Sequence, residues 1–225
     1  MVQNKGTQQP DVSEKPAAPV KSEAAIKRRP GRPRAYDPEV ALERALETFW
    51  KKGYSATSLD DLCAATGMNR PSLYAAFGDK RSLYLKALDF YGRSYAASVK
   101  QAFAADVPLQ EGLLRIYEAA LSIYVPRKGP PRGCFSVGTA TTEAAADPDI
   151  RAALLRGVRN LDKAFDRRIR VAQEKGELSA EADPAVLATL ASGLLHTIAI
   201  RARAGLPRAD LDALTQKAVV TICRS

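Results

Sequence analysis

The fold of this chain is decided by residues 57–80, TSLDDLCAATGMNRPSLYAAFGDK. A hydroxyl at Thr57 or Ser58 can cap the first free N–H groups of a helix, and the acidic residues that follow suit the positive end of its dipole. Gly67 interrupts the apolar period, and glycine readily takes the positive φ that a tight turn between two crossed helices needs. Asn69 can then cap a second helix, in whose first turn a proline costs no hydrogen bond. These residues predict two short helices joined by a tight turn.

The second of these helices has one apolar side and one exposed side. Leu73 and Phe77 stand four residues apart and are expected to face inward. A short exposed helix after a tight turn is the arrangement that places a recognition helix in the major groove of DNA. We therefore predict a helix-turn-helix over about residues 58–77, with double-stranded DNA as its partner. The positions expected to point outward are Arg70, Ser72, Tyr74 and Ala75.

A third helix follows directly. Gly78 can end the second helix, and Asp79 can cap one that starts with Lys80 and Arg81. Cations are disfavoured at a helix N-terminus because the dipole there is positive, but a DNA phosphate at that place would reverse the balance. Lys80, with Thr57 at the start of the first helix, is therefore a candidate phosphate contact. The alternative is that these groups are simply solvated.

The same residues carry a resemblance to a known family. Over about residues 40–87 the chain resembles the DNA-binding domain of the TetR family of bacterial repressors. The positions that carry the resemblance are Gly53, Tyr54, Thr57, Ser58, Gly67, Met68, Asn69, Leu73, Tyr74, Phe77 and Lys80.

The resemblance implies that Thr57 and Lys80 hold phosphates, that Tyr74 touches the DNA backbone, and that its neighbours on the recognition helix lie nearer the base edges. Pro71 stands where the family usually has Gly or Ala, so the operator sequence of a relative does not predict the operator of this chain. The residues expected to contact DNA in this unit are Thr57, Ser58, Asn69, Arg70, Pro71, Ser72, Tyr74 and Lys80.

The segment before the helix-turn-helix predicts a supporting helix. Asp37 can cap it, Pro38 suits its first position, and Gly53 can end it after an apolar stripe. Trp50 is expected to pack in the core or at a domain junction. We therefore assign residues 37–81 to a three-helix DNA-binding domain.

The N-terminal residues 1–36 differ in composition from the rest. They hold eight Lys/Arg and three Asp/Glu, so they carry +5 of the net charge of +9. They lack an apolar period, which predicts a disordered basic tail. Residues 27–34, KRRPGRPR, resemble an AT-hook, in which Arg32 and Arg34 would enter a narrow A/T minor groove. The alternative is a nonspecific basic arm that adds affinity by counterion release.

Residues 82–225 are expected to form a helical effector-binding and dimerisation domain, which makes the fold all-α. No β-patterned run competes with the helical periodicity. The expected helices run from Lys80 to near Ala104 and over residues 109–125, 134–146, 148–175 and 184–204, with a last helix after Pro207; residues 126–133 form a loop rich in Pro and Gly.

The last two helices predict a homodimer. Residues 186–200 are apolar nearly all round, so this helix must be covered on both sides, and a partner chain could cover one of them. A matching stripe on the final helix consists of Leu211, Leu214, Ala218 and Ile222. The alternative is packing wholly within the subunit. A twofold dimer would select a palindromic operator.

A small-molecule effector is expected in the C-terminal core. The candidate lining residues combine bulk with a polar or aromatic handle, although ordinary core packing is the alternative for each of them, including His196, the only histidine. Cys134 follows three cations in the loop, and nearby cations can favour a thiolate, so a redox- or electrophile-sensing repressor is a further alternative. The candidates are Phe103, Tyr117, Tyr124, Cys134, Phe135 and His196.

Other classes of protein find little support in the sequence. One His and three scattered Cys give no metal-ligand cluster, no cofactor motif occurs, and no nucleophile and base are paired as an enzyme would need. Neither a secretory leader nor a membrane span is expected, so we predict a cytoplasmic protein. The leading hypothesis is a ligand-responsive transcriptional repressor, and the second is an architectural DNA-binding protein that uses the basic tail.

Overall fold

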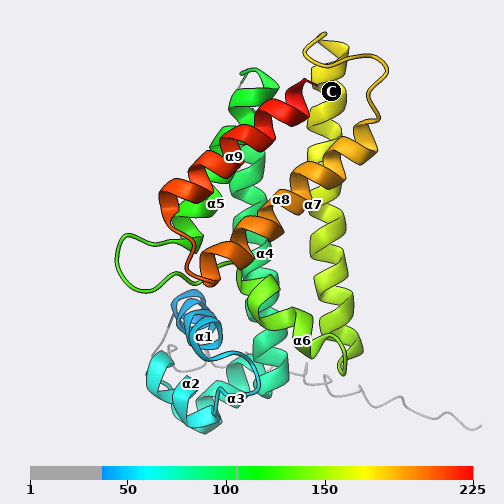
Figure 1. The fold of residues 1–225 in the computed structure, drawn as a ribbon. Coiled ribbons are helices and arrows are strands. Elements are labelled where there is room, and N and C mark those ends of the chain that lie inside the picture. Colours follow the sequence, from blue (N-terminus) through cyan, green and yellow to red (C-terminus); the bar gives the residue numbers. More distant parts are fainter. Residues whose placement is uncertain (1–36, 105, 225) are drawn as a thin grey trace, which may run out of the picture. The chain divides into compact units, whose positions relative to one another are not determined.

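The computed structural model describes residues 37–104 and 106–224, and every regular element within those residues is a helix (Figure 1). The expectation of an all-α fold is confirmed. The elements are α1 Pro38–Lys52, α2 Leu59–Thr66, α3 Arg70–Phe77, α4 Lys80–Ala104, α5 Leu109–Tyr124, the π-helix η1 Ser136–Ala140, α6 Thr141–Glu143, α7 Pro148–Glu174, α8 Pro184–Arg203 and α9 Arg208–Cys223.

Local capping sets the boundaries of the first helices. The Asp37 carboxylate accepts a hydrogen bond from the Glu39 N–H at 2.8 Å and starts α1. Ser58, not Thr57, caps α2, where it forms a capping box with Asp61. Gly67 takes a left-handed conformation with φ of 71° after α2, and the Asn69 side chain then accepts from the N–H of Ser72 at 2.9 Å to start α3. The helix-turn-helix therefore has the structure that its capping residues predict.

α1 and α3 pack on the start of α4, and α2 packs on α1 and α3, around a small core. Leu62 of α2, Leu73 and Phe77 of α3, and Phe49 and Trp50 of α1 are buried in this one core. α4 is 25 residues long and continues from this core into the second part of the molecule, as Figure 1 shows. The same helix therefore belongs to both cores.

The C-terminal helices form a second core. α8 packs against α5, α7 and α9, and α9 packs along α5. α8 is long and apolar enough to cross a membrane by length and composition alone, with a mean hydropathy of 1.5. The neighbouring helices cover only its inner side, so burial in this core accounts for part of that composition, while Val186, Leu190 and Ile200 remain exposed on the other side.

Two expectations about this region need correction. The single helix expected over residues 134–146 is instead a π-helix followed by one short α-turn. The stripe expected on α9 is not a free surface, because Leu211 and Ile222 are buried against their own subunit while Leu214 and Ala218 are half-buried. Leu211 and Ile222 therefore serve the packing within the subunit, while Leu214 and Ala218 remain partly accessible.

Trp50 lies at the junction of the two cores, as expected. Its ring packs edge-on against Tyr91 with centroids 5.2 Å apart, and its Nε1–H donates to the Arg132 carbonyl at 3.3 Å. The Arg132 guanidinium lies 4.0 Å from the indole centroid and also pairs with Glu47 at 2.7 Å. Phe135 completes this cluster. The loop before η1 is thus fastened to α1.

A second set of polar contacts joins α4 to α7 and η1. Arg81 donates to both oxygens of Asp147, at 2.5 and 2.9 Å, and to Asp149 at 2.6 Å. Asp147 is also the N-cap of α7. Higher on α4, the Tyr84 hydroxyl lies 2.7 Å from the Thr139 hydroxyl inside the core. The DNA-binding helices are therefore bonded to the C-terminal helices at several points.

Candidate functional site

The exposed side of α3 is the first candidate site. Arg70, Pro71 and Tyr74 are exposed on it, while Leu73 and Phe77 hold the helix to the core. Tyr74 is 45% exposed and is therefore accessible to a partner. This surface has the shape and composition of a recognition helix.

Arg70 is held at the edge of this surface by an acidic partner. Its Nη2 donates to the two oxygens of Asp60 at 2.8 and 2.9 Å, and its Nε donates at 3.2 Å. Both side chains are largely exposed. The pair ties the first turn of α3 to α2, and Arg70 would have to exchange this carboxylate for a base edge or a phosphate in order to contact DNA.

Two of the expected DNA-contact residues have structural roles in capping. Ser58 and Asn69 both lie on the exposed side, and each uses its side-chain oxygen to accept from the N–H three residues on. Ser72 is half-buried in the first turn of α3. These three groups sit at helix N-termini, where backbone N–H groups favour anions.

Thr57 differs from this expectation. Its side chain is 1% exposed, and its hydroxyl donates to the carbonyl of Gly53 at 2.6 Å. In this conformation the hydroxyl closes the turn between α1 and α2 and does not face outward. A phosphate contact through the Thr57 side chain therefore finds no support in the structure.

Lys80 lies at the first position of α4, next to the turn that precedes α2. Its ammonium is 4.6 Å from the centroid of the Tyr54 ring and 3.4 Å from the Ser55 carbonyl oxygen. These contacts place the cation beside the exposed side of the helix-turn-helix without an acidic partner among the described residues. Arg32 and Arg34, the AT-hook candidates, lie outside the described residues.

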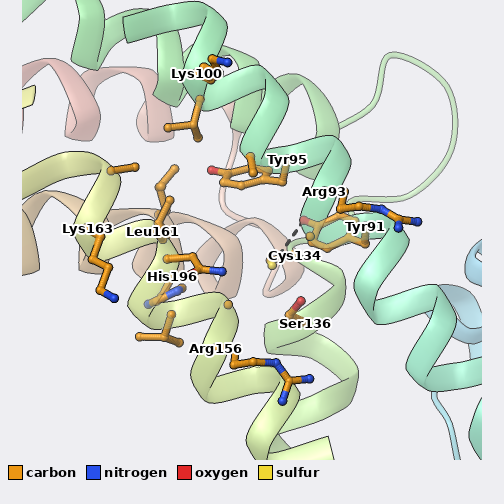
Figure 2. A pocket seen from close by; sticks show the side chains of 18 of the residues that line it. Tyr91, Arg93, Tyr95, Lys100, Cys134, Ser136, Arg156, Leu161, Lys163 and His196 are labelled. Carbon is orange, nitrogen blue, oxygen red and sulfur yellow. Dashed lines mark hydrogen bonds between the residues drawn. The ribbon is translucent and has the colours of Figure 1, made fainter. Parts of the chain in front are cut away.

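The second candidate site is a cavity of about 1450 Å³ between α4, α7 and α8. Tyr95 and Leu161 face each other across it, and Cys134 and His196 line its inner side (Figure 2). Phe103 and Tyr124 also line it. Four of the six expected lining residues therefore meet at one cavity.

Tyr117 and Phe135 do not line the cavity, so the expectation was wrong for both. Tyr117 is fully buried, and its hydroxyl donates to the Ala191 carbonyl of α8 at 2.8 Å. Phe135 is buried in the aromatic cluster around Trp50. In each case ordinary core packing, the alternative reading of the sequence, describes the residue.

Comparison with known proteins decides the family. Residues 41–87 match the family model described as bacterial regulatory proteins, tetR family, and residues 110–217 match the model described as tetracyclin repressor-like, C-terminal domain. The chain belongs to the TetR family. It is therefore a DNA-binding transcriptional regulator, a member of a family of regulators rather than of enzymes.

Individual relatives agree with this assignment along most of the chain. The HTH-type transcriptional repressor ComR of Escherichia coli K12 is 32% identical over 201 residues, which cover 89% of this chain and 94% of the relative. The transcriptional regulator AcuR of Cereibacter sphaeroides is 33% identical over 168 residues, which cover 72% of this chain and 76% of AcuR.

A solved structure shows a related protein on DNA. The TetR-family regulator CifR, solved as a cysteine variant with a 26-base-pair double-stranded operator, has a TM-score of 0.73 to this chain and 31% sequence identity. The match covers 84% of this chain and 98% of CifR.

Cys134 of this TetR-family regulator faces the cavity rather than the cations of its own loop. Its sulfur accepts a hydrogen bond from the Tyr91 hydroxyl at 3.4 Å (Figure 2). Arg132, one of the cations expected to activate the thiol, instead contacts Glu47 and Trp50. The sequence argument for a thiolate therefore loses one of its three cations, while access from the cavity remains.

A group of tyrosines surrounds this thiol. Burial, followed by the neighbouring Cys134, raises the pKa of Tyr91 and of Tyr95, and burial raises the pKa of Tyr124, so all three stay neutral and can donate. The Tyr124 hydroxyl is near enough to Tyr95 to influence its pKa, yet the geometry gives the buried Tyr95 oxygen no hydrogen-bond partner. A buried hydroxyl without a partner costs about 1–3 kcal/mol, which a bound acceptor would recover.

His196 is a neutral member of the lining. Burial lowers its pKa, and only Asp162 opposes that effect. Among the described residues no cluster of three or more His, Cys, Asp or Glu side chains could hold a metal ion. What the lining supplies is apolar surface together with hydrogen-bond donors.

Sequence reasoning missed the cationic part of the lining. Arg156, Lys163 and Arg167 lie on the side of α7 that faces the cavity, and the buried Arg168 reaches its far end. The first three are spaced by seven and four residues, a helical period that was visible in the sequence. Without the neighbouring α4, that period is indistinguishable from a solvated face.

Proposed function

We propose that this TetR-family regulator is a homodimeric repressor that binds a palindromic operator and is released by a small-molecule effector. The observation that carries the proposal is that one continuous helix, α4, starts at Lys80 beside the recognition helix and also forms a wall of the large cavity. The repressor ComR among its relatives and the operator complex of CifR support the same conclusion.

The DNA-contact proposal assigns different tasks to α3 and to the start of α4. Arg70, with Pro71, Ser72 and Tyr74, would read or touch the major groove, and Lys80 would hold a phosphate together with the N-termini capped by Ser58 and Asn69. A base contact carries sequence information, whereas a phosphate contact adds affinity to any sequence.

Site selection from random duplex DNA, followed by binding measurements on variants, tests this assignment. Arg70→Ala should weaken operator binding and relax the preference at one position, by about 1–3 kcal/mol if a bidentate base contact is lost. Lys80→Ala should weaken all sequences about equally and lower the salt dependence. Arg115→Ala, a surface change on α5, is the matched control. Unchanged selectivity in the Arg70 variant would remove α3 from base readout.

The dimer proposal moves most of the interface to α8. Val186, Leu190 and Ile200 are 54%, 57% and 58% exposed, and they share one side of the helix with Gly193 and Thr197. A Cβ added at Gly193 would meet nothing within 4 Å in the single chain, so a partner helix could approach closely there. The less buried residues of α9, Leu214 and Ala218, would complete the interface.

Analytical ultracentrifugation tests the dimer. Leu190→Glu should give a monomer, because a charge in the centre of an apolar interface is left unpaired. Leu155→Glu replaces a comparably exposed leucine of α7 outside this stripe and should remain dimeric. If both variants stay dimeric, the α8 interface is refuted.

Two alternatives remain as distinct proposals. An architectural protein would depend on the basic tail, so a chain that starts at Ala35 should lose A/T-tract binding; a repressor should keep its inverted repeat and lose only salt-dependent affinity. A Cys134-based sensor is favoured by the opening of this residue onto the cavity. Oxidant or electrophile should then release the operator from the wild type and not from Cys134→Ser.

A repressor of this kind acts where the chromosome is, so we also propose a cytoplasmic location. Fractionation of the expressing cells tests this.

A further inference from the structure

The cavity contains buried donors that lack acceptors. Among the described residues, three buried side-chain atoms have no hydrogen-bond partner: the Tyr95 oxygen, Asp166 Oδ1 and Arg168 Nη1. Tyr95 and Arg168 line the cavity, and both of their atoms can donate. The other side of the Arg168 guanidinium is occupied, since Nη2 donates to the Val107 carbonyl at 2.7 Å and lies 3.6 Å from Glu177. A ligand oxygen in the cavity could accept a hydrogen bond from either group.

The charges of the lining residues favour an anionic ligand. Each acidic lining residue already has a cation: Asp89 pairs with Arg93, Asp106 with Lys175, and Asp149 with Arg81. In contrast, four lining cations have no ion pair within residues 37–104 and 106–224; they are Lys100, Arg156, Lys163 and Arg167. All four are exposed to solvent at the edge of the cavity, so they favour an anion there with an attraction that salt weakens.

The remaining lining is apolar and long. Leu88, Val99 and Phe103 from α4 face Leu161 of α7 and Leu195 of α8. On α4 the lining runs from Leu85 to Phe103, which at the rise of an α-helix corresponds to roughly 27 Å. An extended apolar chain fits this length better than a compact polar molecule.

We propose that the cavity binds an elongated hydrophobic carboxylate. Its apolar chain lies between α4 and α7, and its carboxylate lies beside Lys100, Lys163 and Arg167, with Tyr95 donating to a ligand oxygen. Figure 2 shows Tyr95 and Lys163 on the two walls of the cavity that this ligand would join. The inference rests on the proposed function, for which it names the chemical class of the effector.

The test compares dodecanoate with dodecanol, which has the same chain without the charge, on the full-length protein and below the critical micelle concentration. Affinity is measured by calorimetry and by the fluorescence of Trp50. Trp50 is the only tryptophan and contacts Tyr91 of the cavity wall. We expect saturable binding of dodecanoate, at least tenfold weaker binding of dodecanol, and weaker dodecanoate binding at high salt.

Matched variants locate the two ends of the ligand. Lys163→Met with Arg167→Met should weaken dodecanoate about five- to tenfold and leave dodecanol nearly unchanged. Arg159→Met removes an exposed cation of α7 that does not line the cavity and should change neither affinity. Tyr95→Phe should weaken dodecanoate about three- to tenfold, whereas Tyr117→Phe, outside the cavity, should not.

The outcomes separate this inference from the proposed function. Equal affinity for dodecanoate and dodecanol, equal effects of the Arg159 and Lys163/Arg167 variants, or no binding of either compound would overturn the inference. Charge-dependent binding that leaves the operator complex intact in an anisotropy assay would support the ligand class and contradict release by an effector. Release of the operator by uncharged compounds alone would support release by an effector and contradict the proposed ligand class.

Discussion

Replacing Gly133 by alanine should destabilise the protein more than any other single methyl group added to its loops. Gly133 is buried with φ of 63°, in the left-handed region that costs an L-residue about 1–2 kcal/mol. A Cβ at this position would also lie 2.6 Å from the Ala199 carbonyl oxygen of α8. That oxygen belongs to the helix backbone and cannot move aside cheaply, so overpacking adds about 1–3 kcal/mol. We expect Gly133→Ala to lower the free energy of unfolding by about 2–5 kcal/mol.

Thermal and urea unfolding followed by circular dichroism measure this loss. For a chain of this size, each 1 kcal/mol lowers Tm by roughly 2–4 °C, so the Tm of Gly133→Ala should fall by about 4–20 °C. Gly129→Ala is the matched control, because Gly129 has φ of 96° but its added Cβ meets nothing within 4 Å. The control should therefore show only the backbone cost, about 1–2 kcal/mol. Equal losses in the two variants would refute the argument from close approach to α8.

Four further changes test other parts of the structure. Ser58→Ala should lower the free energy of unfolding by about 1 kcal/mol in urea titrations, because it removes the capping box of α2. Gly92→Ala should raise it by about 0.5–1 kcal/mol, since this mid-helix position of α4 has open space for a Cβ. Arg132→Met should red-shift Trp50 emission and lower Tm, because the loop then loses the ion pair with Glu47 and the guanidinium contact with the indole ring. Arg81 holds the pKa of Asp147 at about 2, below its ordinary 3.8, so this carboxylate stabilises the fold above about pH 4 and loses that effect as the pH falls toward 2. Asp147→Asn, which keeps a capping side chain, should lower Tm near neutral pH and flatten the acid part of the Tm profile; an unchanged profile would contradict this.

The helix-turn-helix could be predicted because its determinants are local. Ser58, Gly67 and Asn69 each act within three residues of their own position, so no knowledge of the rest of the fold was needed. The inward orientation of the Thr57 hydroxyl could not be predicted in the same way, because the hydroxyl turns back to the carbonyl of Gly53 and nothing in the spacing distinguishes that bond from a free hydroxyl.

The cavity could be predicted only in part because its walls come from helices far apart in the sequence. Tyr117 and Tyr124 stand seven residues apart on the same side of α5, and the sequence treats them alike. Only the position of α8 separates them, since it supplies the Ala191 carbonyl to Tyr117 while Tyr124 is left at the cavity. The cations of α7 were missed for the same reason.

α4 and α7 are joined by contacts near both ends of α4 and enclose the cavity between those contacts. Near the DNA-binding helices they are joined by Arg81 and the first turn of α7, and at the far end of α4 by the edge-to-face pair Phe103 and Phe165, whose ring centroids are 5.3 Å apart. A helix held at both ends cannot shift as a whole when a ligand presses on its middle. It bends instead, and its two ends rotate. Gly92, at the middle of α4 and in the cavity wall, is where α4 resists bending least. We expect a bulky ligand at midspan to rotate the start of α4, and a slender one to fill the cavity without doing so. Affinity and the power to release DNA would then be separate properties, so that a tight ligand can act as an antagonist.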